Sequence, residues 1–265
     1  MSAPTPAAHR AAMPSAWAAW AALFSATALA WTLTLRSASG MAASPGTMGR
    51  GVAGFVVLWT VMMAAMMLPS VSPVVSLYAH TIREGSTGWT RAARSTGLVT
   101  GYLTAWAAFG LIGYAAAWGG GRLAAHSPGA APWAGAVTLA AAGLYQLSPL
   151  KDRCLSHCRS PLGFLIRFGG YSGRLRDLRV GLYHGAYCVG CCWGLMVVLI
   201  VVGVMNVAWM AGLAAAVFVE KIWRHGKGFR IAVGVALIVF ACFVPAHPGL
   251  VPGLHDMGMA TGGSM

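Results

Sequence analysis

The sequence predicts an all-α fold, a polytopic membrane bundle of about seven transmembrane helices. The chain has 265 residues, of which 58% are hydrophobic and only 9% charged, whereas a soluble domain carries about a quarter charged residues. The apolar residues also form continuous runs that can cross a hydrocarbon core of about 30 Å, which takes roughly 20 helical residues. A β-barrel would instead show alternating segments of about ten residues.

The apolar runs predict the helices in chain order. They are expected at about 14–35, 51–80, 96–118, 132–149, 180–204, 206–222 and 229–245. The first run is similar to a signal peptide, but it is long and contains three tryptophans, so we expect a retained anchor. The second run contains Pro69 and Pro73, which a membrane bundle tolerates when neighbouring helices satisfy the freed carbonyls.

The positions of Lys and Arg predict the orientation. With the N-terminus in the cytoplasm, 15 of the 18 basic residues fall on the inner side, and only Arg36, Arg50 and Arg122 fall outside. The pattern predicts an N-in, C-out protein of the bacterial inner membrane. The net charge of +13 then indicates anionic lipid headgroups as partners, and we expect no nucleic-acid binding.

Three parts follow from this topology: a cytoplasmic tail at 1–13, the bundle at 14–245 with a cytoplasmic loop at 150–179, and an outer tail at 246–265. The loop carries seven basic residues and the motif CLSHC. For the outer tail we expect a flexible segment, with copper collection as the alternative, because Met and His are soft donors. Its candidate donors are His247, His255, Asp256, Met257 and Met259.

The motif CVGCCW at 188–193 holds three of the six cysteines. On a helix, His184, Cys188 and Cys191 lie within about 60° of arc, with Cys192 beside them. Four glycines around this stripe let another helix approach closely. A single membrane cysteine indicates packing, but three thiols with a histidine one turn earlier favour metal ligands or a redox couple. Thiolate and imidazole suit Cu(I), Zn(II) or iron.

Two methionines add soft donors from the second helix. Met62 and Met66 share one face of WTVMMAAMMLPS, where methionine alone indicates flexible core packing. At 1.5 Å per residue, Met62 lies about 16 Å below the outer surface, and Cys191 about 14 Å above the inner one. Both depths are near the midplane. If the two helices touch, we expect a Cu(I) site between them.

The loop motif contributes Cys154 and Cys158, whose spacing directs both sulfurs the same way on a helix. With Cys188 and Cys191 they form a four-cysteine set of the zinc or iron–sulfur kind. Cys188, about 9 Å deep, can meet them only if the loop folds back into the bundle. One site with a relay and two separate sites both stay open, and a disulfide is disfavoured in a reducing cytoplasm.

Polar residues inside the apolar runs are functional candidates by default. Glu220 and Lys221 close the sixth run, and Tyr145 and Gln146 close the fourth. The pair at 220–221 is equally compatible with a functional group and with an ordinary ending of a helix at the membrane surface.

Three stretches together resemble a bacterial family of uncharacterised, predicted metal-binding integral membrane proteins. They are WTVMMAAMMLPS at 59–70, YQLSPLKDRCLSHCRSP at 145–161 and GAYCVGCCWGLMVVLIVVGVMN at 185–206. The resemblance spans roughly 50–222 and implies metal binding without a defined reaction. Position by position it points to Cys154, Cys158, Cys188, Cys191 and Cys192. His184, Met62 and Met66 rest on spacing and depth alone.

The sequence therefore predicts a membrane protein that handles Cu(I), in preference to zinc or iron, for transfer, sensing or assembly of a copper enzyme. A copper enzyme or a metallochaperone would be its partner. One alternative is a thiol-redox protein or a subunit of a membrane redox enzyme, although a thiol couple needs exposure and a lowered pKa. The other is a structural subunit. The chain lacks covalent-haem, P-loop, HExxH and dinucleotide-binding motifs, so binding is favoured over catalysis.

Overall fold

The computed structural model describes residues 6–39, 46–82, 87–160, 162–163, 166, 173 and 175–254, with side chains of the first helix from residue 20 onward. Regular structure in these residues is helical, which confirms the all-α class. The helices are α1 (Pro6–Ser39), α2 (Val52–Thr81), α3 (Gly88–His126), α4 (Ala131–Leu147), α5 (Pro149–Arg159), α7 (Arg176–Val202), α8 (Val207–Ile222) and α9 (Gly226–Phe243), with the 3-10 turns η1 (Pro248–Leu250) and η2 (Pro252–Leu254).

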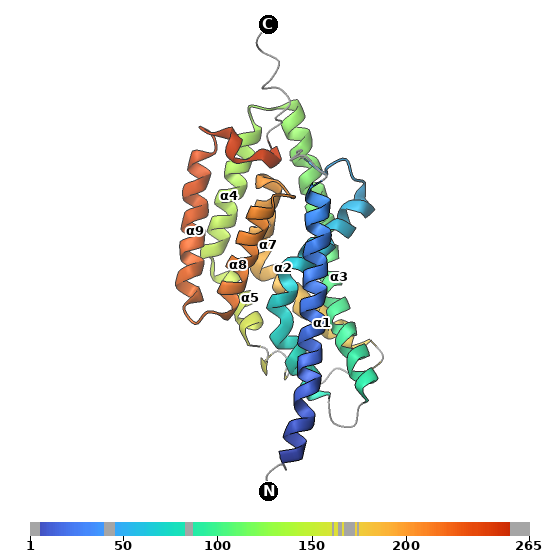
Figure 1. Ribbon diagram of the computed structural model, residues 1–265. Coiled ribbons are helices and arrows are strands. Elements are labelled where there is room, and N and C mark those ends of the chain that lie inside the picture. Colours follow the sequence, from blue (N-terminus) through green and yellow to red (C-terminus); the bar gives the residue numbers. More distant parts are fainter. Residues whose placement is uncertain are drawn as a thin grey trace.

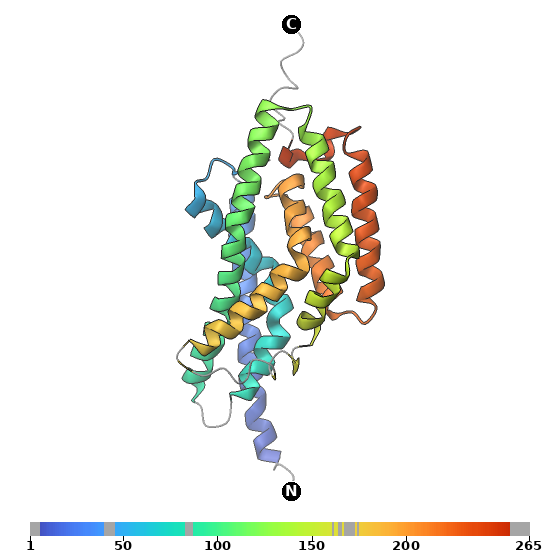
Figure 2. The same cartoon turned by 180° about the vertical axis from the view of Figure 1, so that it is seen from behind.

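The helices run up and down an elongated bundle (Figure 1). Helix α1 begins at the lower end in this view, and η1 and η2 lie at the upper end. Helices α4 and α9 pack side by side on one flank, and α1 packs on α2 on the other. Helix α7 crosses the bundle obliquely from the lower part of α3 towards α4 and α8 (Figure 2). It therefore packs on α3, α4, α5 and α8 and occupies the centre.

Within the described residues, four helices are long and apolar enough to cross a membrane: α2, α3, α7 and α9. This is consistent with a multi-pass membrane protein. Helices α4 and α8 are shorter, with 17 and 16 residues. The seven-span count and the N-in, C-out orientation stay predictions. The helix expected at 14–35 is longer than expected, because α1 begins at Pro6.

Helices α3 and α7 cross at glycines. A Cβ on Gly101 of α3 would collide with the carbonyl of Leu178, and a Cβ on Gly181 of α7 would collide with the carbonyl of Leu98. Small residues at such a crossing allow two backbones to touch. The close approach predicted from the glycines of α7 is thus present, and it holds the lower half of α7 against Tyr102 of α3.

The segment at 150–179, expected as the connection between two membrane helices, begins with a short helix. Helix α5 starts with Pro149, and the Ser148 hydroxyl accepts a hydrogen bond from the Lys151 backbone N–H at 3.3 Å. Proline at the first position and a serine cap are a standard helix start. Helix α5 packs on α7 and α8, so this part of the chain folds back onto the bundle. The candidate donors of the outer tail at 255–259 lie outside the described residues.

Candidate metal centre

Three thiols of α7 form the centre of a sulfur cluster. The sulfur atoms of Cys188, Cys191 and Cys192 all lie within 4.8 Å of one another, and the three side chains are at most 1% exposed. Spacings of three and four residues place side chains on one face of a helix. The Cys191 and Cys192 thiols donate to the backbone carbonyl of Cys188 at 3.1 and 2.8 Å. The cluster is therefore internal to the bundle.

Helix α5 brings further thiols to the same place. The sulfur of Cys158 lies 3.8 Å from the sulfur of Cys191. The sulfur of Cys154 packs over Gly190, where an added Cβ would lie 3.1 Å from it. Both α5 cysteines are half-buried. The two cysteine motifs, which the sequence left as one site or two, thus meet along one α5–α7 interface.

The sulfur spacing fits a shared metal ion. Two sulfurs bound to one tetrahedral metal at about 2.3 Å lie about 3.8 Å apart, which is the observed separation of Cys158 and Cys191. All six cysteines, including the exposed Cys242 on α9, are free thiols. The donor set consists of soft sulfur ligands, which suits Cu(I) or zinc better than magnesium or calcium.

Two polar side chains reach the Cys188 sulfur. The Lys221 ammonium of α8 donates to it at 3.1 Å, and the Tyr102 hydroxyl of α3 hydrogen-bonds with it at 3.0 Å. The ammonium also donates to the Ser70 hydroxyl of α2 at 3.0 Å. Neither Tyr102 nor Ser70 was singled out from the sequence. Four helices therefore meet around one sulfur.

Glu220 and Lys221 are not an ordinary helix ending at a membrane surface, because their side chains are only 1% and 8% exposed. Lys151 is fully buried as well, so these two lysines do not contact lipid headgroups as the charge pattern suggested. The polar signal at 220–221 was visible in the sequence, but its two interpretations were equally weighted there. Burial excludes the ordinary surface ending.

A second polar network fixes α5 beside α7. The Glu220 carboxylate accepts hydrogen bonds from the Lys151 ammonium and from the Gln146 amide, each at 2.7 Å, and Lys151 also donates to the Gln146 carbonyl oxygen. Arg159, next to Cys158, donates to the backbone carbonyl of Glu220 at 2.8 Å. This network joins α4, α5 and α8, and it anchors the end of α5 that carries Cys158 to α8.

The other predicted ligands, His184, Met62 and Met66, are all buried. His184 is buried one turn before Cys188, with its ring centroid 5.8 Å from that of Tyr102. Met62 and Met66 are buried in α2. Met66 lies one turn before Ser70, on the same face of α2, and the described hydrogen bonds of the cluster reach α2 at Ser70. The role of these three residues as ligands stays a prediction.

The partly buried position of Cys154 changes the pKa of its thiol. Burial raises the pKa of this thiol, and the nearby Cys191 sulfur raises it further, against a smaller opposite effect of Tyr145. The thiol is therefore protonated at neutral pH, and a metal must displace that proton to bind.

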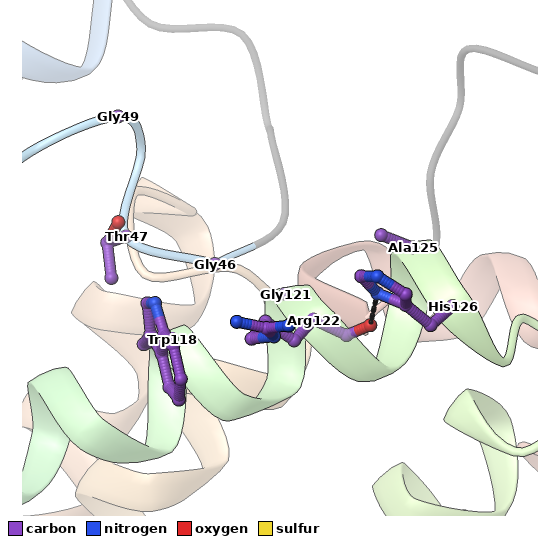
Figure 3. Close-up of a pocket in the computed structure, with 8 residues that line it drawn as sticks. All are labelled: Gly46, Thr47, Gly49, Trp118, Gly121, Arg122, Ala125 and His126. Atoms are coloured by element: carbon purple, nitrogen blue, oxygen red, sulfur yellow. Dashed lines mark hydrogen bonds between the residues drawn. The ribbon is translucent and has the colours of Figure 1, made fainter.

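A cavity of about 460 Å³ lies far from the sulfurs, near the C-terminal end of α3 (Figure 3). The Arg122 guanidinium lies 5.0 Å from the Trp118 ring centroid, and His126 Nδ1 lies 2.9 Å from the Arg122 carbonyl. The cavity contains no cysteine, so it is separate from the cluster. It is lined by Gly46, Thr47, Gly49, Trp118, Gly121, Arg122, Ala125 and His126.

Comparison with known families links the chain to copper. Residues 56–244 match the family PpoB2, described as a copper chaperone. The chain belongs to this family. The matched region extends from α2 to the end of α9 and contains all six cysteines. No curated protein and no solved structure matches the chain. Membership supports the predicted link to copper, while the ligands and the oxidation state stay predictions.

Proposed function

We propose that this chain is a copper chaperone of the bacterial inner membrane that holds Cu(I) between α5 and α7 and passes it to a copper enzyme or another metallochaperone. The observation that carries the proposal is the contact of Cys158 with Cys191 at 3.8 Å, made between helices of a copper-chaperone family member. Thiolates are the ligands that favour Cu(I).

The five clustered thiols have different exposures, which suits transfer. Cys188, Cys191 and Cys192 are buried, whereas Cys154 and Cys158 on α5 are half-buried. A copper ion that uses two of the five thiols leaves three available for exchange. Copper enters or leaves through the α5 thiols and is held by the α7 thiols. One sulfur is replaced at a time, so the metal is not released as a free ion.

The test is copper retention by the full chain in detergent, kept anaerobic and reduced. The wild-type chain is loaded with Cu(I), separated from unbound metal and assayed for copper per chain. We expect Cys191→Ser to lose most of the copper and Cys158→Ser to lose part of it. Cys242→Ser is the matched control, because this thiol is exposed on α9, and it should retain the wild-type amount.

The proposal fails if the wild-type chain retains no more copper than a variant in which all five clustered cysteines are serine. The same Cys158–Cys191 contact supports a second candidate, a thiol-redox protein, because the two sulfurs are close enough to react after a small shift. Thiol labelling across a series of redox buffers separates the two. A defined two-electron midpoint in metal-free protein, together with poor copper retention, would favour the redox candidate.

A further inference from the structure

Lys221 differs from the other buried charges of the described structure. Four charged side chains are buried there: Lys151, Glu220, Lys221 and Arg230. Lys151 pairs with Glu220 at 2.7 Å, and Arg230 pairs with the Asp152 carboxylate at 3.1 Å. No described carboxylate lies within ion-pair distance of Lys221, whose ammonium contacts the Cys188 sulfur and the Ser70 hydroxyl. Its charge is therefore directed at the sulfur cluster.

A copper–thiolate complex needs such a charge. Cu(I) carries one positive charge and each thiolate one negative charge, so copper held by two thiolates is a complex of charge −1. An unpaired anion in the interior of a bundle is costly. We propose that Lys221 is the counter-cation of this complex and that Cys188 is its anionic terminal ligand. The inference rests on the function proposed above.

The geometry at Cys188 supports the terminal role. A thiolate sulfur has three lone pairs, and the Lys221 ammonium at 3.1 Å and the Tyr102 hydroxyl at 3.0 Å use two of them. One lone pair remains for a metal, so Cys188 binds one copper ion and does not bridge two. The sulfurs of Cys191 and Cys192 lie within 4.8 Å of it, and the Cys158 sulfur lies 3.8 Å from that of Cys191, so one of these three thiols supplies the other ligand.

The ammonium is held in place by its surroundings. Ser70 accepts its hydrogen bond from α2, and the neighbouring Glu220 is fixed by Lys151 and Gln146. The last turn of α8 therefore cannot move the charge away from Cys188 without breaking a buried ion pair. Lys221 is therefore held where its charge can compensate that of the copper–thiolate complex.

The experiment compares Cu(I) affinities of the full chain in detergent, measured by competition with a chromogenic Cu(I) chelator. Lys221→Met and Lys221→Gln remove the charge, and we expect each to weaken Cu(I) binding by about tenfold or more. Lys221→Arg keeps the charge and should bind within a few-fold of wild type. Lys227→Met is the matched control, because Lys227 is exposed at the start of α9, and its affinity should be unchanged.

The outcomes separate the two proposals. If the wild-type chain does not bind Cu(I), the proposed function fails and this inference with it. If wild type binds and both neutral variants bind equally well, only the role of Lys221 is overturned. If Lys221→Arg binds as weakly as the neutral variants, side-chain shape matters instead of charge, and the inference is again overturned. Two neutral variants are used because methionine lacks the hydrogen-bond donor of lysine and could impair folding. Glutamine removes the charge but keeps a donor.

Discussion

Two buried lysines, seventy residues apart in the chain, lie at the last turn of α8 and have different partners. Lys151 of α5 contacts Glu220, and Lys221 is the next residue of α8. Lys151 is fully buried and pairs with the Glu220 carboxylate at 2.7 Å. Lys221 is 8% exposed and donates to the Cys188 sulfur at 3.1 Å. Because consecutive helix positions point about 100° apart, the last turn of α8 directs Glu220 towards α4 and α5, and Lys221 towards α2 and α7.

The difference lies in the partner. The Lys151–Glu220 contact joins a positive and a negative group, and removing either would leave the other buried without its partner. A thiol can exchange its proton for a metal ion. The Lys151 pair therefore stabilises the position of α5 whatever is bound, whereas the proposal above makes the Lys221 contact dependent on copper. One helical turn thus combines a structural ion pair with the charge that we propose to compensate bound copper.

The largest expected effect comes from breaking the structural pair. Glu220→Gln leaves the Lys151 ammonium buried without a counter-charge, and we expect a loss of about 3–5 kcal/mol in the free energy of unfolding. Lys221→Met should cost only about 1 kcal/mol, because its sulfur partner can become a neutral thiol and only hydrogen bonds are lost. Denaturant unfolding of both variants in the same detergent, without metal, measures the difference.

A double variant tests the cause of that loss. Lys151→Met with Glu220→Leu removes both charges and fills their space with apolar groups, so it should recover most of the stability lost by Glu220→Gln. Equal stability of Glu220→Gln and wild type would contradict the structural role of the pair.

A smaller effect is expected at the other contact between α5 and α8. Arg159 donates to the carbonyls of Glu220 and Trp223, and its side chain is half-buried. Arg159→Met should therefore cost about 1–2 kcal/mol. It should also make Cys158 react faster with a maleimide, because α5 then separates more easily from α7. Arg153→Met, on the exposed face of the same helix, should change neither quantity, and no acceleration at Cys158 would show that α5 is held by other contacts.

The ion pair of Arg94 with Asp177 is more exposed than the Lys151–Glu220 pair, so it tests how burial affects the cost of losing a charge. The Asp177 carboxylate accepts from the Arg94 guanidinium at 3.2 Å and from the Tyr78 hydroxyl, and the Asp177 side chain is 20% exposed. Water screens such a pair, so Asp177→Asn should cost at most about 1 kcal/mol. A loss as large as that of Glu220→Gln would mean that burial does not explain the ranking. Unfolding under the same conditions provides the measurement.

The sequence predicted the parts of the site that one helix determines. Cys188, Cys191 and Cys192 share a face of α7 because helical periodicity alone places them there, and the observed sulfur distances within 4.8 Å agree. The glycines of α7 also indicated a close helix contact. These features depend on local geometry, which a sequence contains directly.

The contacts between helices could not be predicted in the same way. Cys158 and Cys191 are 33 positions apart, as are Cys188 and Lys221, and their distances depend on how α5, α7 and α8 pack. The sequence analysis counts Lys151 and Lys221 among the positive charges expected on the cytoplasmic side. Nothing in the sequence indicates that both side chains are buried. The start of α5 did carry a usable signal, because Ser148 followed by Pro149 is typical of a helix N-terminus.

The smallest effect concerns a thiol that has no described lysine beside it. Burial and the nearby Cys191 sulfur raise the pKa of Cys154, and the thiolate is the form that reacts with alkylating reagents. Because a raised pKa keeps the thiol protonated to higher pH, alkylation of metal-free Cys154 should be slower at neutral pH than that of an unstructured cysteine peptide. Its rate should also continue to rise at pH values where the peptide has levelled off. Mass spectrometry of the labelled full chain, with the peptide in the same reaction, measures both rates. Identical pH profiles would place Cys154 in water and contradict its packing over Gly190.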